Sequence, residues 1–167
     1  MTGACVIGVG NPYRGDDGAG LAVARAVADL APEGVRICEL DGDVARLLDL
    51  WTDDDEVYVA DMVRCGDPAG SVHWWDVRAH DVVAESLRGS SHHVSLAEVF
   101  ALGRVLGRLP RTLVLVGVEG ADYDAGCELS PAVSRGVDDA AHRILAAVGQ
   151  AVRAAPHPPK LQRLRAR

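Results

Sequence analysis

The chain has 167 residues, of which 49% are hydrophobic and 25% charged, and its formal net charge at pH 7 is −7. This length suits one domain, since a single hydrophobic core commonly serves about 100–200 residues. No apolar run approaches the ~18 residues that cross a bilayer, and the first residues lack the basic stretch of a signal peptide. We therefore expect no membrane partner and a cytoplasmic location.

The charges are unevenly distributed along the chain. Residues 151–167 carry five basic and no acidic side chains, so the acid excess lies in the rest of the chain. An acidic body argues against nucleic acid as a partner. We expect one α/β domain over residues 1–154 and a basic, proline-containing tail over residues 155–167 that is disordered.

Four cysteines lie far apart in the sequence and form no C-x-x-C pair. This spacing is typical of buried or incidental thiols in a reducing compartment and does not indicate a zinc site. The four are Cys5, Cys38, Cys65 and Cys127.

In the first part of the chain, strand patterns alternate with helical ones. Residues 5–9, 35–40 and 57–60 are short apolar runs typical of strands, and the third ends just before Asp61. Asp43 is the expected N-cap of a helix between the second and third strands. Two sets of apolar residues with helical spacing predict the helices. They are Val23, Ala26, Val27 and Leu30 for the first, and Val44, Leu47, Leu48 and Trp51 for the second.

The second part of the chain continues the alternation. Residues 71–77 predict a strand near an edge of the sheet, and a capping box from Ser95 to Glu98 predicts a helix that runs to about residue 106. Residues 112–118 are the most hydrophobic strand, which we expect at the centre of the sheet. Ser130 as N-cap and Pro131 at the first helical position predict a long last helix.

This order predicts a three-layer α/β fold, in which a twisted, mostly parallel sheet carries helices on both faces in a flavodoxin-like layout. Ligands bind such sheets beyond the carboxyl ends of the strands, where the strand order reverses. If the first strand lies between the second and third, Asp16 and Asp17 face Asp61 across that crevice. Asp41, after the second strand, is a neighbour that could steady the site.

The glycine-rich turn after the first strand permits several interpretations. Its Gly8-x-Gly10 start is typical of a dinucleotide site, but Tyr13 stands where the third glycine would fall. Asp16 and Asp17 would also repel a pyrophosphate at the start of the next helix. Both acids suit the helix dipole, which stabilises each by about 0.3–1 kcal/mol, and both suit a cation. Spacing leaves capping and cation binding open, and we assign one of the two acids to capping.

Asp61 ends an apolar strand and has no helix to cap, which favours a ligand or catalytic role over a structural pairing with Arg64. His92 and His93 lie in a loop before the capped helix. One imidazole with two carboxylates makes an open ligand set that suits nickel or zinc, and the other histidine is then a bystander. The remaining histidines share no spacing and are interpreted as structural or solvated. They are His73, His80, His142 and His157.

Seven segments carry a further pattern, namely Gly8–Asn11, Gly15–Gly20, Leu40–Gly42, Val59–Asp61, Ser91–Glu98, Val116–Glu119 and Leu129–Pro131. In this order and spacing the chain resembles the hydrogenase maturation proteases over nearly all of residues 4–150. The resemblance implies a five-stranded twisted sheet between helices. It also implies an endopeptidase that removes a short C-terminal extension from the large-subunit precursor of [NiFe]-hydrogenase once nickel has been inserted.

The resemblance further implies which residues carry the reaction. The family's metal-binding and catalytic positions fall on Asp17, Asp61 and His92, and Asp17 stands where relatives have Glu or Asp. His92, rather than His93, keeps the family register, because it stands four positions before Leu96. The nickel would be carried by the substrate and used for recognition, and no organic cofactor is expected.

Two other functions stay open from the residues alone. One is a flavodoxin-like module that binds a metal or nucleotide without protease activity, which would hold tightly bound metal or nucleotide after purification. The other is a metal-dependent hydrolase of small substrates, which would turn over without any partner protein.

Overall fold

The computed structural model describes residues 3–53, 55–79, 95–124, 126 and 128–154. The expected tail over residues 155–167 and the loop that holds His92 and His93 lie outside the described residues. No helix in the described part of the chain is long and apolar enough to cross a membrane.

The five strands form one sheet in the order β2-β1-β3-β5-β4. The strands β1 (Ala4–Val9), β2 (Arg36–Leu40), β3 (Glu56–Val63) and β5 (Thr112–Glu119) are parallel. The fifth, β4 (Val72–Asp76), pairs antiparallel with β5 at an edge, as expected. β3, and not β5, occupies the centre, because β4 follows β5 on its outer side.

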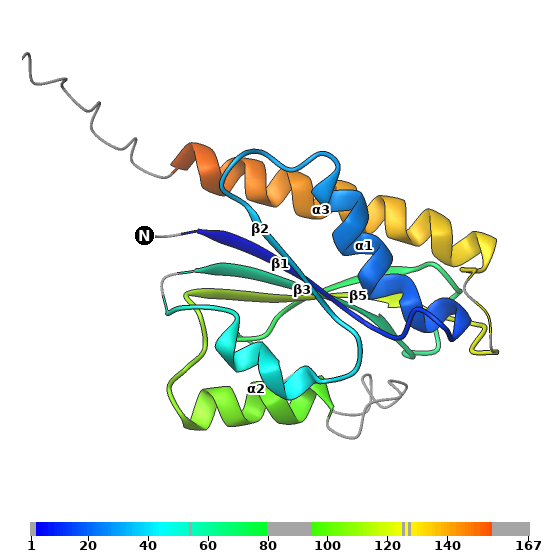
Figure 1. The fold of residues 1–167 in the computed structure, drawn as a ribbon, viewed down its shortest axis with the longest axis horizontal. Coiled ribbons are helices and arrows are strands. Elements are labelled where there is room, and N and C mark those ends of the chain that lie inside the picture. The colour runs from blue at the N-terminus through cyan, green and yellow to red at the C-terminus, as the bar shows by residue number, and fades with distance from the viewer. Residues whose placement is uncertain (1–2, 54, 80–94, 125, 127, 155–167) are drawn as a thin grey trace, which may run out of the picture.

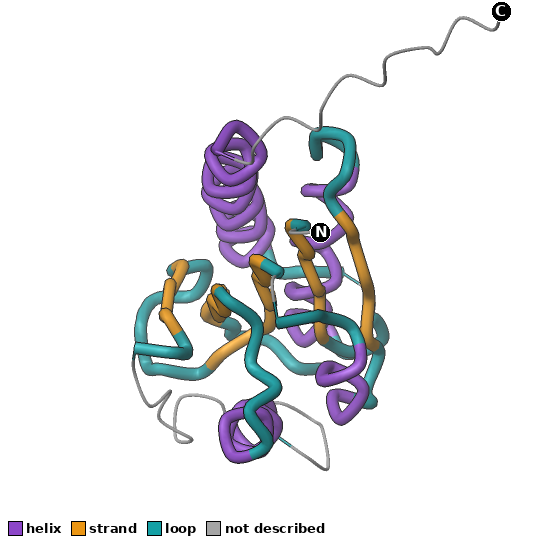
Figure 2. Tube along the Cα trace, turned by 90° about the vertical axis from the view of Figure 1, so that its left-hand side faces the viewer, coloured by secondary structure: helices purple, strands orange, loops and turns teal. Residues whose placement is uncertain are grey.

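Helices cover both faces of the sheet (Figure 1). One face carries α1 (Ala19–Ala28) and α3 (Pro131–Ala154), and the other carries the 3-10 helix η2 (Val44–Asp49) and α2 (Leu96–Val105). Figure 2 shows the strands between these two layers. Each layer closes a separate hydrophobic core built on the alternating side chains of the same strands. The three-layer α/β prediction is therefore confirmed.

The helix predicted after Asp43 is a 3-10 helix of six residues whose N-cap Asp43 makes no side-chain capping bond. All four apolar residues assigned to its face are nevertheless buried. In α1 the predicted stripe is only partly right, because the helix ends at Ala28 and Leu30 beyond it is 68% exposed. The capping box of α2 is confirmed, with Ser95 Oγ accepting from Glu98 N and the Glu98 carboxylate accepting from Ser95 N.

The end predicted for the third strand is wrong. β3 does not stop before Asp61 but continues to Val63, and Asp61 pairs with Gly117 inside the ladder with β5. The strand continues because Met62 and Val63 are both buried, each facing one of the two cores. Asp61 is therefore held by the sheet itself.

Candidate active site

The strand order reverses at β1, which lies between β2 and β3 as the sequence predicted. Sheets of this kind bind ligands at such a reversal, beyond the carboxyl ends of the two strands, here β1 and β3, and we call this place the crevice. Gly20, in the first turn of α1, lets the helix approach both strands closely. A Cβ atom at Gly20 would lie 2.1 Å from the carbonyl oxygen of Val9 and 2.3 Å from that of Ala60. The start of α1 is thus pressed against the rim of the crevice.

The turn between β1 and α1 fixes Asp17 at this rim. Asp17 belongs to the 3-10 helix η1 (Gly15–Gly18) and is 1% exposed. Its N–H donates to the carbonyl of Arg14 at 3.1 Å, and its carbonyl accepts from Asn11 N at 3.0 Å. Gly10 has φ +155°, and a Cβ atom there would lie 2.2 Å from the Asp17 carbonyl oxygen. Backbone contacts therefore hold Asp17 from both sides.

Asp61 is buried, with 1% of its surface exposed. By strand alternation its side chain lies on the same face as Val59 and Val63, which pack into the core with η2 and α2. Asp61 Oδ1 accepts a hydrogen bond from Met62 N at 2.8 Å, while Oδ2 is buried without a hydrogen-bond partner among the described residues. A buried carboxyl oxygen without a donor is costly, and a proton or a cation relieves the cost.

The negative charge of Asp17 affects the pKa of Asp61. Burial raises the pKa of Asp61 well above its ordinary value, the hydrogen bond from Met62 N opposes this, and the negative charge of Asp17 raises it further. The segment η1 also contacts β3 directly. Asp17 and Asp61 thus lie close enough for their charges to interact, and burial shifts Asp61 toward its protonated form.

Asp16, next to Asp17, has a different role. It is fully buried, and its carboxylate accepts hydrogen bonds from Ala121 N at 2.9 Å, Asp122 N at 2.8 Å, Ser130 N at 2.7 Å and Ser130 Oγ at 3.1 Å. Burial raises the pKa of Asp16, but these hydrogen bonds outweigh it and the pKa lies below its ordinary value. Asp16 is structural, but it fastens the segment after β5 and does not cap α1, whose N-cap Gly18 has no side-chain bond.

Two neighbours considered for the site, Arg64 and Asp41, are placed by the structure as follows. Arg64 stacks on Tyr123, with its guanidinium carbon 3.4 Å from the ring centroid, and the hydrogen bond that Asp61 Oδ1 accepts comes from Met62 instead. Asp41 follows β2 and is exposed. His92, the third expected ligand, lies outside the described residues, so the structure brings together only Asp17 and Asp61 of the three.

Sequence reasoning passed over one buried acid at the same end of the sheet. Glu119, the last residue of β5, is 3% exposed and holds the loop after β3 through its carboxylate. It belongs to the segment Val116–Glu119 that carried the family resemblance, but no spacing within the sequence set it apart as a functional residue.

The family model for hydrogenase maturation proteases matches residues 23–147. The hydrogenase 2 maturation protease of Escherichia coli is 28% identical over 149 residues, which cover 86% of this chain and 88% of that protein.

Solved structures give the same result. An endopeptidase from Escherichia coli superposes with a TM-score of 0.77 at 25% identity, over 89% of this chain and 93% of the other. A hydrogenase 2 maturation peptidase from a Thaumarchaeota archaeon gives a TM-score of 0.63 at 27% identity, over 88% and 98%. These matches favour a protease over a binding module without chemistry. The chain belongs to the hydrogenase maturation protease family and is an endopeptidase of that family.

Proposed function

We propose that this endopeptidase removes the C-terminal extension of a [NiFe]-hydrogenase large-subunit precursor after nickel insertion, in the cytoplasm. The observation that carries the proposal is the pair of buried carboxylates, Asp17 and Asp61, at the strand-order reversal. It is supported by the family to which the chain belongs and by the name of the Escherichia coli relative, a hydrogenase 2 maturation protease.

His92 is the third residue of the proposed site, and chain connectivity supports it. It stands four positions before Leu96, the first residue of α2. Leu96 belongs to the same core as Val9 and Val63, which flank the crevice at the ends of β1 and β3. The α2 layer also covers the face of β3 from which Asp61 projects.

Two carboxylates and one imidazole would make an open set of oxygen and nitrogen ligands, suited to a borderline divalent ion. We propose that these residues contact the nickel centre of the precursor, which makes the metal a recognition element of the substrate. The raised pKa of Asp61 suits a group that exchanges a proton during the reaction. One of the two carboxylates would take a proton from the attacking water as its oxygen bonds to the scissile carbonyl carbon, and would pass that proton to the amine that leaves when the C–N bond breaks.

The decisive experiment incubates the purified chain with nickel-loaded and nickel-free precursor and reads the mass of the large subunit. Cleavage of the loaded form alone supports the proposal, and equal cleavage of both forms refutes the role of nickel. Asp17→Asn and Asp61→Asn should abolish processing while circular dichroism shows a folded protein. Asp29→Asn, an exposed carboxylate at the end of α1, is the matched control and should cleave normally.

A further inference from the structure

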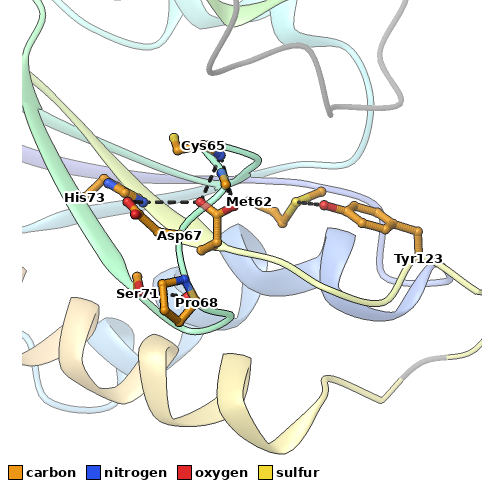
Figure 3. Close-up of polar contacts among 9 residues, drawn as sticks. Met62, Cys65, Asp67, Pro68, Ser71, His73 and Tyr123 are labelled. Carbon is orange, nitrogen blue, oxygen red and sulfur yellow. Dashed lines mark hydrogen bonds and ion pairs between the residues drawn. The ribbon is translucent and has the colours of Figure 1, made fainter.

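A second group of metal-ligating side chains lies beside the candidate active site. Cys65 follows β3, His73 lies in β4, and Glu119 ends β5. Their potential ligand atoms, one each of sulfur, nitrogen and oxygen, all lie within 4.8 Å of one another. Figure 3 shows Cys65 and His73 gathered at this end of the sheet, with Asp67 beside His73. None of these side chains is used in the proposed cleavage.

Glu119 is the fixed point of the group. Its buried carboxylate accepts the N–H of Cys65 at 2.9 Å on both oxygens and the N–H of Gly66 at 2.9 Å on Oε1. Gly66 has φ +91°, a conformation that favours glycine, so the turn that presents these two N–H groups depends on that residue. The turn places the Cys65 side chain next to the carboxylate and leaves Cys65 exposed to solvent.

His73 is oriented as a metal ligand would be. Its Nε2 lies 3.2 Å from Glu119 Oε2 and 3.5 Å from Asp67 Oδ2. The imidazole stacks on Trp75, with ring centroids 5.0 Å apart and an interplanar angle of 3°. Gly117, the ladder partner of His73, makes this stack possible, because a Cβ atom there would lie 2.8 Å from the Trp75 ring. The ring is therefore held with one nitrogen facing two carboxylates.

Gly117 of β5 lies between this second group and the candidate active site. Asp61 pairs with Gly117 from one side and His73 pairs with it from the other. Two strand spacings, about 10 Å, thus lie between the backbones of Asp61 and His73. The two ligand sets also differ chemically, since only the second contains a thiol.

We propose that Cys65, His73 and Glu119 bind a divalent cation of the zinc type, with water or the exposed Asp67 carboxylate, 3.5 Å from His73 Nε2, in the fourth position. Thiolate, imidazole and carboxylate are the ligands that Zn²⁺ prefers, at bond lengths of about 2.0–2.3 Å. Tetrahedral ligands then stand ~3.3–3.6 Å apart, so atoms that now lie within 4.8 Å of one another must approach by at most ~1.5 Å, and the exposed Cys65 side chain can supply that movement. The ion fastens the β3–β4 loop to the end of β5.

The test uses the full chain, stripped of metal under reducing conditions and titrated with Co²⁺ as a spectroscopic substitute for Zn²⁺. Binding should produce a thiolate-to-cobalt charge-transfer band in the near ultraviolet, which Zn²⁺ then abolishes by displacement. Cys65→Ser should remove the band. His73→Gln, which keeps a hydrogen-bonding side chain, should weaken Co²⁺ binding by more than the ~10–100-fold that loss of an outer-shell partner costs.

Three controls separate this site from others in the chain. Cys38→Ser and Cys127→Ser should keep the band, and so should Asp61→Asn, since the proposed catalytic site contains no thiol. A band that is absent from the wild type, or that survives Cys65→Ser, overturns the proposal. Because Cys65 is exposed, its serine variant tests the site without disturbing the core. The cobalt band is measured without precursor cleavage. The proposed function can therefore be refuted while the metal site is confirmed, and the metal site can be refuted while the proposed function is confirmed.

Discussion

Asp16 and Ser130 are joined by two hydrogen bonds across 114 residues of sequence, from the Ser130 N–H at 2.7 Å and its hydroxyl at 3.1 Å. Ser130 directly precedes α3, so this contact links the turn after β1 to the start of the last helix. The Asp16 carboxylate also accepts from Ala121 N and Asp122 N, which follow β5. One buried carboxylate thus fastens three segments beside the crevice.

Asp16→Asn should destabilise the protein by about 1–3 kcal/mol, because the amide nitrogen would face N–H donors that now meet a carboxylate oxygen. The loss should be largest above pH ~4, since a carboxylate with a lowered pKa contributes stability there and loses it as the pH falls. Urea unfolding at pH 7 measures the effect. The control is Asp124→Asn, which changes an exposed carboxylate in the segment after β5 that Asp16 holds. Equal stabilities of the two variants would contradict the role of Asp16.

Asp61 should impose the opposite pH dependence. Because its pKa is raised on folding, the folded state binds the proton more tightly than the unfolded state. Stability then falls as the pH rises above ~4, the ordinary Asp pKa, toward the folded pKa. Asp61→Asn mimics the protonated carboxyl and can keep the Met62 hydrogen bond, so it should match the wild type near pH 4 and exceed it at pH 8. Urea unfolding across this range checks the prediction, and a constant difference between the proteins would contradict it.

The close approach of α1 to the sheet predicts a large effect of one methyl group. Gly20→Ala would place Cβ within 2.3 Å of two backbone carbonyl oxygens, which should cost about 1–3 kcal/mol or more and displace the start of α1. Gly18→Ala, two residues earlier, has its nearest neighbour at 3.5 Å and a φ of −82°. It should be neutral or slightly stabilising. Thermal unfolding of the pair compares the two positions directly.

The adjacent histidines His92 and His93 give a prediction about which of them is the third residue of the proposed site. His92→Ala should abolish processing of the nickel-loaded precursor, and His93→Ala should leave it within a few-fold of the wild type. Mass analysis of the large subunit over time measures both. The reverse result would move the third ligand to His93, and full activity of both variants would remove the doublet from the site.

The sequence predicted the alternation of strands and helices and the position of the crevice, because apolar periodicity and capping residues are local signals. It misplaced the end of β3, since Asp61 interrupts the apolar pattern. A buried acid inside a strand is costly and has no periodic signature. It also treated Leu30 as part of the core, although α1 ends at Ala28.

Contacts between distant segments could not be predicted. Cys65, His73 and Glu119 meet only because β4 turns back on β5 with His73 opposite Gly117, and that register is a property of the sheet. The spacing of the cysteines therefore gave no hint of a mixed ligand set. The role of Asp16 was hidden for the same reason, because its partners lie more than 100 residues away.

The pairing of Asp61 with Gly117 has a consequence for how the protein acquires activity. Successive residues of a strand face opposite sides of the sheet, so a shift of β3 by one residue would turn Asp61 toward α1 and α3. The same shift would exchange Val59 and Val63 with residues of the other core. Misfolded molecules with a shifted β3 would therefore lose the packing of both cores and the position of the Asp61 carboxylate together. Such molecules would be inactive and would not be unselective proteases.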